Sequence, residues 1–410
     1  MILKKPRLRS FAEAHNQRHI TAGDRYLYAQ PKITQSLVVI GCGTMGQEHM
    51  RVAAILGRMR VQGIFDTHQY SLDCAEDNYR QYSSEPLVRY DDLRSACMDP
   101  AADVLLICTP NYTHMDILQV AMQSGKPILL EKPMATDLAD AAAIVELDAD
   151  YKSFIQIGLQ YRFKAQYVEA FHEALVRRSL GTLKTIAVSE HRPPFLDKVE
   201  QWNKYNRYTG GTLVEKCCHY FDLINRLAES TPVKVYASGG QAVNFIDFER
   251  GGEPADIDDH AFVVIDYANG VRANFSLNMF AHGFFEELVV GGDRGCLKAR
   301  ESVDFHRQTD PEVTLHMEFG ETAAARKTQL SYPSIIEESG HQGATYYQHA
   351  ALADRLDGVL TAIGGSVAAT PREGFTAMLV ASAAQASMAS GDALLIDDFL
   401  CRCGMQPITL

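Results

Sequence analysis

The sequence lacks several features that would define whole classes of protein. It has no uninterrupted apolar run long enough to cross a bilayer. Its first residues carry charge but no apolar stretch behind it, so we expect neither a membrane partner nor a secretory signal. We find no repeat of solenoid period, no low-complexity tract, and no HExxH motif or Cys/His cluster that would bind a metal.

The sequence also lacks a regular cysteine pattern and a net positive charge. The nine cysteines are scattered without framework spacing, and the Cys401-x-Cys403 pair is too isolated to predict a zinc site. Ordinary reduced thiols and a cytoplasmic location are the expectation. The formal net charge of −12 argues against nucleic-acid binding and favours a small-molecule substrate.

The length and the order of patterns predict two domains. Residues 36–155 alternate short apolar strands with helices, which is typical of a doubly wound parallel sheet of the Rossmann type. Residues 156–400 predict an α/β domain with a large, open, mostly antiparallel sheet, because successive runs are β-rich and separated by turns such as Asn269-Gly270. These runs are 183–191, 233–238, 260–267, 271–279, 284–291 and 295–299.

The two ends of the chain differ from these domains. Residues 1–35 hold seven basic and two acidic side chains, a balance of +5, and form an N-terminal extension. Either a loosely packed segment or an arm that clasps an acidic neighbouring subunit fits this composition. Helical patterns at 344–390 are expected to pack back towards the first domain, and 401–410 is a tail.

A glycine-rich turn organises the first domain. The apolar run 37–40 leads into Gly41-x-Gly43-x-x-Gly46, and a helix is predicted over 44–60, with Thr44 and Met45 in its first turn. In such a turn the first glycine allows a sharp reversal, the second lets backbone N–H groups approach a pyrophosphate, and the third lets the helix pack on the strand. The helix N-terminus favours negative charge, so the motif predicts dinucleotide binding.

An acidic residue after the next strand indicates which dinucleotide is bound. Asp66 ends the apolar run 61–65 and lies 20 residues past Gly46, where an acid can bind the adenosine ribose hydroxyls. Because Thr67 and His68 follow it rather than Arg or Lys, we expect NAD rather than NADP. The competing interpretation is an ordinary glycine turn followed by an exposed aspartate.

Two further loops follow buried strands of the first domain. Thr109, Pro110, Asn111 and His114 come after the run 104–108, and Glu131 and Lys132 come after 127–130. Ligands of open α/β sheets lie beyond the carboxyl ends of the strands, so we expect both loops beside the cofactor. A surface salt bridge is the alternative for the charged pair.

The second domain contains a possible acid–base cluster. After Gly210-Gly211, the residues Glu215, His219 and Asp222 lie at i, i+4 and i+7 of a predicted helix. Glu215 is expected to hold and orient the imidazole of His219, which a general base requires. A solvated helix face and a metal site are the alternatives.

Taken in this order, the motifs resemble those of the Gfo/Idh/MocA family of glucose–fructose oxidoreductases and inositol dehydrogenases. The resemblance covers about 36–400 and also includes Gly340-His341-x-Gly343. It implies a Rossmann domain followed by an open-sheet domain that often forms oligomers, here a homodimer or homotetramer. It further implies a Lys132–Pro133 cis bond.

The resemblance also implies roles for individual residues. Lys132 would lie beside the nicotinamide and the reacting hydroxyl, His219 would move the hydroxyl proton, and Asp222 would contact substrate. Glu131 and Asn111 would line the nicotinamide ribose. The chain departs from the pattern at Glu215, where the dehydrogenases usually carry Asp.

These observations predict an NAD-dependent dehydrogenase that acts on a secondary alcohol or ketone of a sugar, cyclitol or related polyol. Lys132, His219 and Glu215 are its predicted catalytic residues. Further substrate contacts are expected from a set of residues that could equally be structural, namely Tyr161, Arg162, Trp202 and His341.

Two other functions remain open on the sequence. Some glycosidases that resemble this family hold NAD tightly and hydrolyse by transient oxidation and elimination. Some repressors of related fold sense a ligand without turnover, although the presence of both Lys132 and His219 argues against that function. Steady-state NADH release distinguishes the dehydrogenase from both.

Overall fold

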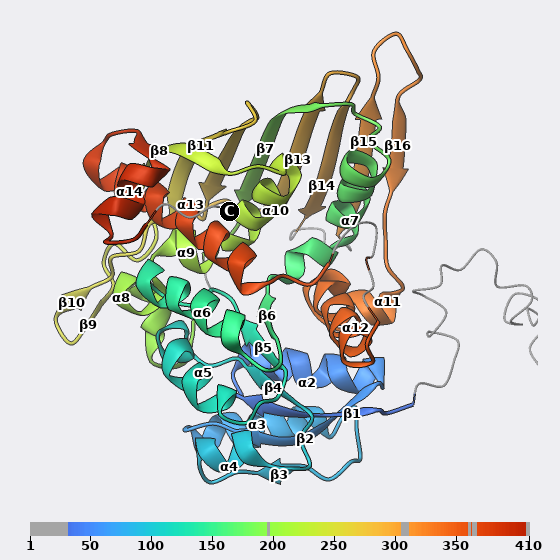
Figure 1. Cartoon of the computed structure of the whole chain (residues 1–410), viewed down its shortest axis with the longest axis vertical. Coiled ribbons are helices and arrows are strands. Elements are labelled where there is room, and N and C mark those ends of the chain that lie inside the picture. The colour runs from blue at the N-terminus through green and yellow to red at the C-terminus, as the bar shows by residue number, and fades with distance from the viewer. Residues whose placement is uncertain (1–31, 195–196, 305–310, 360–361, 363–366, 407–410) are drawn as a thin grey trace, which may run out of the picture.

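The structure is a computed structural model, and it describes residues 32–194, 197–304, 311–359, 362 and 367–406. The two predicted sheets are both present, one above the other in Figure 1. Residues 1–31 of the predicted extension and 407–410 of the tail lie outside the described residues.

The first sheet is parallel throughout, as predicted, with strand order β3-β2-β1-β4-β5-β6. Its strands are β1 (Gln35–Ile40), β2 (Met59–Phe65), β3 (Val88–Arg89), β4 (Val104–Ile107), β5 (Ile128–Glu131) and β6 (Ile155–Gly158). Its helices are α2 (Thr44–Leu56), α3 (Gln69–Tyr79), α4 (Leu93–Met98), α5 (His114–Met122) and α6 (Leu138–Asp150). β6 crosses the boundary predicted at residue 155, and the division into domains stays a prediction.

The β1 strand shows why this sheet is buried. Leu37 and Val39 belong to one hydrophobic cluster, while Val38 and Ile40 belong to another. Successive side chains of a strand point to opposite faces, so helices must cover both faces of the sheet. The strand therefore has a continuous apolar run rather than an alternating pattern.

The second sheet has nine strands in the order β16-β15-β14-β13-β7-β12-β11-β8-β17. Every neighbouring pair is antiparallel except β7 with β12, which confirms the mostly antiparallel prediction. The strands are β7 (Leu183–His191), β8 (Pro232–Gly240), β11 (His260–Tyr267), β12 (Arg272–Asn278), β13 (Phe284–Gly292), β14 (Cys296–Val303), β15 (Glu312–Glu318), β16 (Arg326–Gln329) and β17 (Leu394–Leu395). A separate hairpin pairs β9 (Glu249–Arg250) with β10 (Glu253–Pro254).

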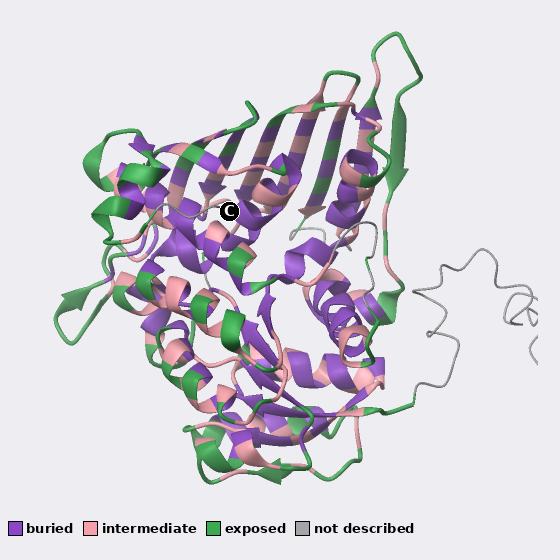
Figure 2. Cartoon of the chain, viewed as in Figure 1, coloured by how far each residue is buried: buried purple, intermediate pink, exposed green. Residues whose placement is uncertain are grey.

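Helices cover one face of the second sheet, and the strands alternate between buried and less buried residues in Figure 2. The covering helices are α7 (Ala165–Phe171), with a π-helical turn at His172–Val176, α10 (Cys218–Ala228), α13 (Pro371–Ser390) and α14 (Ile396–Arg402). On the other face the side chains of Tyr236, Phe262 and Val264 are exposed.

The remaining helices are α8 (Asn206–Thr209), α9 (Thr212–Glu215), α11 (Ser334–Glu337) and α12 (Ala344–Leu356). Short 3₁₀ turns lie at Asn111–Thr113, Gln160–Phe163, Val199–Lys204 and His341–Gly343. Helix α12 packs on α2, and α13 packs on α6. Beyond the carboxyl ends of β4 and β5, the turn Asn111–Thr113 packs on α8 and Lys132 contacts Glu215 at the end of α9.

Candidate functional site

The surroundings of each glycine in the first turn explain why a glycine is needed there. Gly41 has φ +97°, and a Cβ on it would lie 2.6 Å from the backbone carbon of Cys108. A Cβ on Gly46 would lie 2.0 Å from the carbonyl oxygen of Gly41, so any larger residue would separate helix and strand. A Cβ on Gly43 would meet no atom within 4 Å. This open space lies at the start of α2, where free N–H groups favour a phosphate.

The open space at Gly43 and the close contact at Gly46 predict that substitutions at these two glycines affect NAD binding and protein stability differently. We expect Gly43→Ala to change the free energy of unfolding by under about 0.5 kcal/mol, because its Cβ enters empty space at an allowed φ of −70°. NAD affinity should fall roughly tenfold or more, because the methyl group occupies the approach to the backbone N–H groups. Calorimetric NAD titration and chemical denaturation measure the two effects.

Gly46→Ala is the contrasting variant, since its Cβ would overlap the Gly41 carbonyl. It should be destabilised by about 1–3 kcal/mol. Equal NAD affinity in Gly43→Ala and the wild type would contradict a pyrophosphate site above Gly43.

The carboxylate of Asp66 closes this turn at the end of β2. It accepts a hydrogen bond from the backbone N–H of Cys42 at 2.7 Å and from that of His68 at 2.8 Å. Arg89, on the neighbouring strand β3, already pairs with Asp73 and Glu76. The turn therefore has a fixed acid beside it, and the nearby Arg89 is already paired with carboxylates rather than free to bind a 2′-phosphate.

The loop after β4 combines one fixed and one unpaired polar side chain. His114 is fully buried, with Nδ1 at 2.8 Å from the carbonyl oxygen of Pro133 and Nε2 at 3.0 Å from that of Thr109. It joins the loops after β4 and β5 rather than facing open space. The buried Nδ2 of Asn111 has no hydrogen-bond partner within the described residues, so it can donate to a ligand. Asn111 therefore fits the predicted cofactor contact, whereas His114, also predicted to contact the cofactor, instead holds the two loops together.

Glu131 is buried at the end of β5 and is held by a histidine pair. Its Oε1 lies 3.1 Å from Nε2 of His49, and Nδ1 of His49 lies 2.7 Å from Nε2 of His349. These contacts join β5, α2 and α12. The alternative of a surface salt bridge between Glu131 and its neighbour is wrong, because Glu131 is only 4% exposed and pairs with His49.

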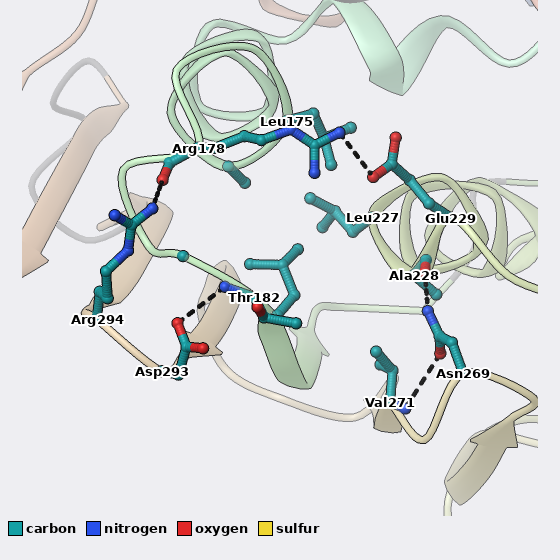
Figure 3. Close-up of a pocket in the computed structure, with 13 residues that line it drawn as sticks. Leu175, Arg178, Thr182, Leu227, Ala228, Glu229, Asn269, Val271, Asp293 and Arg294 are labelled. Atoms are coloured by element: carbon teal, nitrogen blue, oxygen red, sulfur yellow. Dashed lines mark hydrogen bonds and ion pairs between the residues drawn. The ribbon is translucent and has the colours of Figure 1, made fainter.

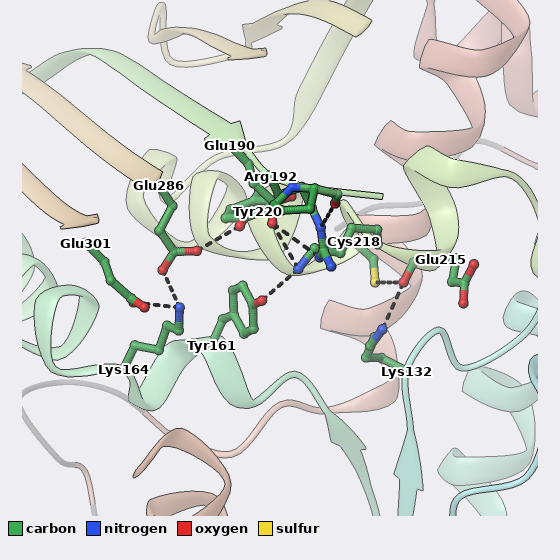
Figure 4. A network of polar contacts seen from close by, with 12 residues as sticks. Lys132, Tyr161, Lys164, Glu190, Arg192, Glu215, Cys218, Tyr220, Glu286 and Glu301 are labelled. Atoms are coloured by element: carbon green, nitrogen blue, oxygen red, sulfur yellow. Dashed lines mark hydrogen bonds and ion pairs between the residues drawn. The ribbon is translucent and has the colours of Figure 1, made fainter. Parts of the chain in front are cut away.

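Lys132 projects from the first sheet into the second domain. Its Nζ donates to the backbone carbonyl of Glu215 at 3.0 Å (Figure 4). The Lys132–Pro133 bond is cis, which confirms that prediction. The lysine therefore stands where the two domains meet, beside the segment that carries His219.

His219 lies at the start of α10 and is buried. Its ring stacks on that of Tyr161, with centroids 4.0 Å apart and planes 6° from parallel, and its Nδ1 has no partner within the described residues. Burial, followed by the charges of Lys132 and Lys216, lowers the pKa of His219 well below its ordinary value. The imidazole is therefore neutral at pH 7 and able to accept a proton.

The structure corrects the expected role of Glu215. The predicted single helix is broken between α9 and α10, and the Glu215 carboxylate faces Lys198, whose Nζ is 3.6 Å away, rather than His219. The i, i+4 spacing assumed a continuous helix, which this break removes. The solvated-face alternative is also wrong, since Glu215 is 4% exposed and His219 2%.

Arg162 and Asp222 were predicted substrate contacts, but the structure pairs them with each other. The guanidinium of Arg162 donates from Nε and from a terminal nitrogen to the two Asp222 oxygens, each at 2.6 Å. Glu373 lies 2.9 Å from the same guanidinium. All of Arg162 except 1% is buried, so this cluster joins α10, α13 and the turn after β6 instead of facing a substrate.

The other predicted substrate residues lie around His219 and the α8 segment. Nδ1 of His341 lies 2.7 Å from the Glu48 carboxylate, and its ring is 6.2 Å from that of Tyr161. Trp202 is 8% exposed, with the Tyr112 ring 6.2 Å from its own and Nζ of Lys198 4.7 Å from its centroid.

Sequence reasoning missed Lys198, Lys216, Glu190, His49 and His349 in this region. Lys216 directly follows Glu215, and His49 lies three residues past Gly46, so proximity to the motifs was an available signal. Glu190 and His349 had no such signal, because only the packing of β7 and α12 brings them near the motifs.

A separate cavity of about 710 Å³ lies beside the ends of α10 and of the π-helical turn (Figure 3). Leu175, Leu183 and Leu227 form an apolar part, and Arg178 pairs with Glu229. None of the predicted site residues lines this cavity, and we assign no chemistry to it. Across the residues that the structure places, there is no cluster of three potential metal ligands and no helix that could span a membrane.

Comparisons with known proteins identify relatives in sequence and in fold. Two relatives are the inositol 2-dehydrogenases of Paracoccus denitrificans, 31% identical over 66% of this chain and 75% of that protein, and of Rhizobium meliloti, 26% identical over 64% and 74%. The structure of a levoglucosan dehydrogenase in complex with NADH and levoglucosan has a TM-score of 0.72 at 18% identity, and covers 88% of this chain and 99% of its own.

Two family models match most of the chain. Residues 36–159 match the oxidoreductase family, NAD-binding Rossmann fold, and residues 172–395 match the oxidoreductase family, C-terminal alpha/beta domain. The first domain is thus an NAD-binding domain, and the chain belongs to the Gfo/Idh/MocA oxidoreductase family.

Proposed function

We propose that the protein transfers hydride between nicotinamide and a secondary alcohol or ketone of a sugar, cyclitol or related polyol. NAD, when bound, supplies the hydride chemistry. The observation that carries the proposal is the contact of Lys132 with the Glu215 carbonyl, because it brings a lysine of the NAD-binding domain to the segment that holds His219. Relatives named inositol 2-dehydrogenase and levoglucosan dehydrogenase support a polyol substrate.

The chain's own groups divide the work of proton transfer. The Lys132 ammonium polarises the reacting oxygen, and the neutral imidazole of His219 takes the hydroxyl proton during oxidation or returns it during reduction. Burial strengthens both interactions because it excludes water from the charges. Glu215 pairs with Lys198 through Oε1. Its other oxygen, Oε2, is buried without a partner within the described residues and can accept a hydrogen bond from a substrate hydroxyl.

We propose NAD as the cofactor and a homodimer or homotetramer as the assembly. The position of Asp66 at the glycine turn, with Arg89 already paired to Asp73 and Glu76, supports NAD. The exposed Tyr236, Phe262 and Val264 support association through the open face of the second sheet. The cytoplasmic location stays a prediction.

The experiment is NADH formation by the purified protein against a panel of inositols, aldoses, anhydrosugars and amino sugars, with NADP as the control. We expect steady-state NADH release with NAD for at least one polyol. Hydrolysis of a glycoside without net NADH would indicate the glycosidase mechanism. Tight sugar binding without turnover of any substrate would indicate a sensor.

A further inference from the structure

A buried chain of polar contacts connects Tyr161, Lys216 and Glu190 (Figure 4). The Tyr161 ring stacks on His219, and the Tyr161 hydroxyl accepts a hydrogen bond from Nζ of Lys216 at 2.7 Å. Nζ of Lys216 is also 3.2 Å from a carboxylate oxygen of Glu190 on β7. Three elements thus converge beneath one imidazole: the turn after β6, the α9–α10 junction and β7.

The burial of these groups makes their arrangement costly unless each has its partner. Lys216 is 6% exposed, Tyr161 5% and Glu190 0%. Burial alone would lower the pKa of Lys216, but Glu190 and Tyr161 raise it above its ordinary value, so the ammonium is charged. Arg192 also faces Glu190, at 3.6 Å. Lys216 is buried and charged, so the loss of its partners would cost more free energy than the loss of an exposed ion pair.

We propose that Lys216 is a positioning residue of the acid–base site: it fixes the Tyr161 ring on which His219 lies, and its charge acts on that imidazole. This inference rests on the proposed function only in giving His219 the role of base. Lys216 itself is not required to touch a substrate, because its ammonium is held by Tyr161 and Glu190.

The charges around His219 determine whether removal of the Lys216 charge raises or lowers the pKa of His219. The cations that face it are Lys132 after β5, Lys164 after β6, Lys216 and, when protonated, His341. The carboxylates of Glu215 and Asp222 are engaged by Lys198 and Arg162. Removal of the Lys216 charge would take one repelling cation from His219 and leave Glu190 less compensated. Both changes favour the imidazolium, so they raise the pKa of His219.

The test is a histidine titration by NMR with [13Cε1]histidine-labelled protein, in which the signal of His219 is identified by its loss in His219→Gln. In Lys216→Met we expect the His219 midpoint at least one pH unit above that of the wild type. The acid limb of kcat/KM should move upwards with it, so that activity in mildly acidic buffer falls about tenfold per unit. Lys216→Arg keeps the charge and should restore most of the wild-type titration.

Two further variants separate structure from charge. Lys216→Met/Glu190→Gln removes both buried charges, and its His219 midpoint should lie between those of Lys216→Met and the wild type. Tyr161→Phe keeps the stacked ring but removes its hydrogen bond, and should lower kcat several-fold with little change in KM. If Lys216→Met does not fold, the double variant and Tyr161→Phe carry the test.

An unchanged His219 midpoint in a folded variant without Lys216 would overturn the proposal. A Tyr161→Phe variant in which only KM is raised would also overturn it, because that result indicates that Tyr161 contacts the substrate. The NMR titration needs no substrate. A wild type inactive against every polyol therefore refutes the proposed function, while a shifted midpoint in Lys216→Met still supports the positioning role.

Discussion

Lys132→Met lowers kcat by about 10²- to 10⁴-fold and leaves NAD binding intact, if the ammonium polarises the reacting oxygen as proposed. Methionine is also unbranched but one atom shorter than lysine, so the substitution removes the charged end of the side chain and its hydrogen bond to the Glu215 carbonyl. The loss should appear equally in kcat and kcat/KM, because the interaction strengthens in the transition state. Steady-state NADH formation over a range of substrate concentrations measures kcat and kcat/KM, and NAD titration measures cofactor binding.

His219→Ala should cause a loss of similar size, because the buried imidazole that stacks on Tyr161 is the proposed base. The wild-type pH profile gives an independent check. The base must be unprotonated, and burial lowers its pKa well below the ordinary value of 6.5. Activity therefore persists into mildly acidic buffer and falls only as the pH drops through that depressed pKa.

Lys152→Met is the matched control for the lysine, since this exposed lysine of the same domain lies away from the α9–α10 segment. It should have wild-type kinetics. Normal turnover by Lys132→Met or His219→Ala, with NAD bound, would exclude the assigned roles.

Asp222→Ala should destabilise the protein by about 3–5 kcal/mol, because it leaves the buried guanidinium of Arg162 without its two-point partner. Glu373 alone cannot replace both contacts, since it also caps the N-terminus of α13 with Thr370. We expect a lower midpoint of chemical denaturation and a thermal midpoint reduced by several degrees.

The double variant Arg162→Met/Asp222→Leu makes this prediction specific. It removes both charges together, so it should be more stable than Asp222→Ala despite containing more changes. A wild-type denaturation midpoint in Asp222→Ala, together with a raised KM, would instead show that Asp222 contacts substrate.

Short-range patterns determined most of the elements. The strand predictions 183–191 and 260–267 match β7 and β11, because both runs are rich in β-branched and aromatic residues, which favour strands. Strand β15 (Glu312–Glu318) and its neighbour β16 (Arg326–Gln329), which forms the edge of the sheet, were missed. β16 is exposed along its whole length, so it has no apolar periodicity and forms only by pairing with β15.

The sequence by itself determined the glycine turn, the acid after β2 and the polar residues that end β4 and β5, because each lies within a few residues of the strand or helix that positions it. Only the tertiary structure decided which charges meet. Asp222 pairs with Arg162, Glu215 with Lys198 and Lys216 with Glu190. Helical spacing says which side chains share a face, but the partner of a buried charge depends on which distant strand or loop packs against that face.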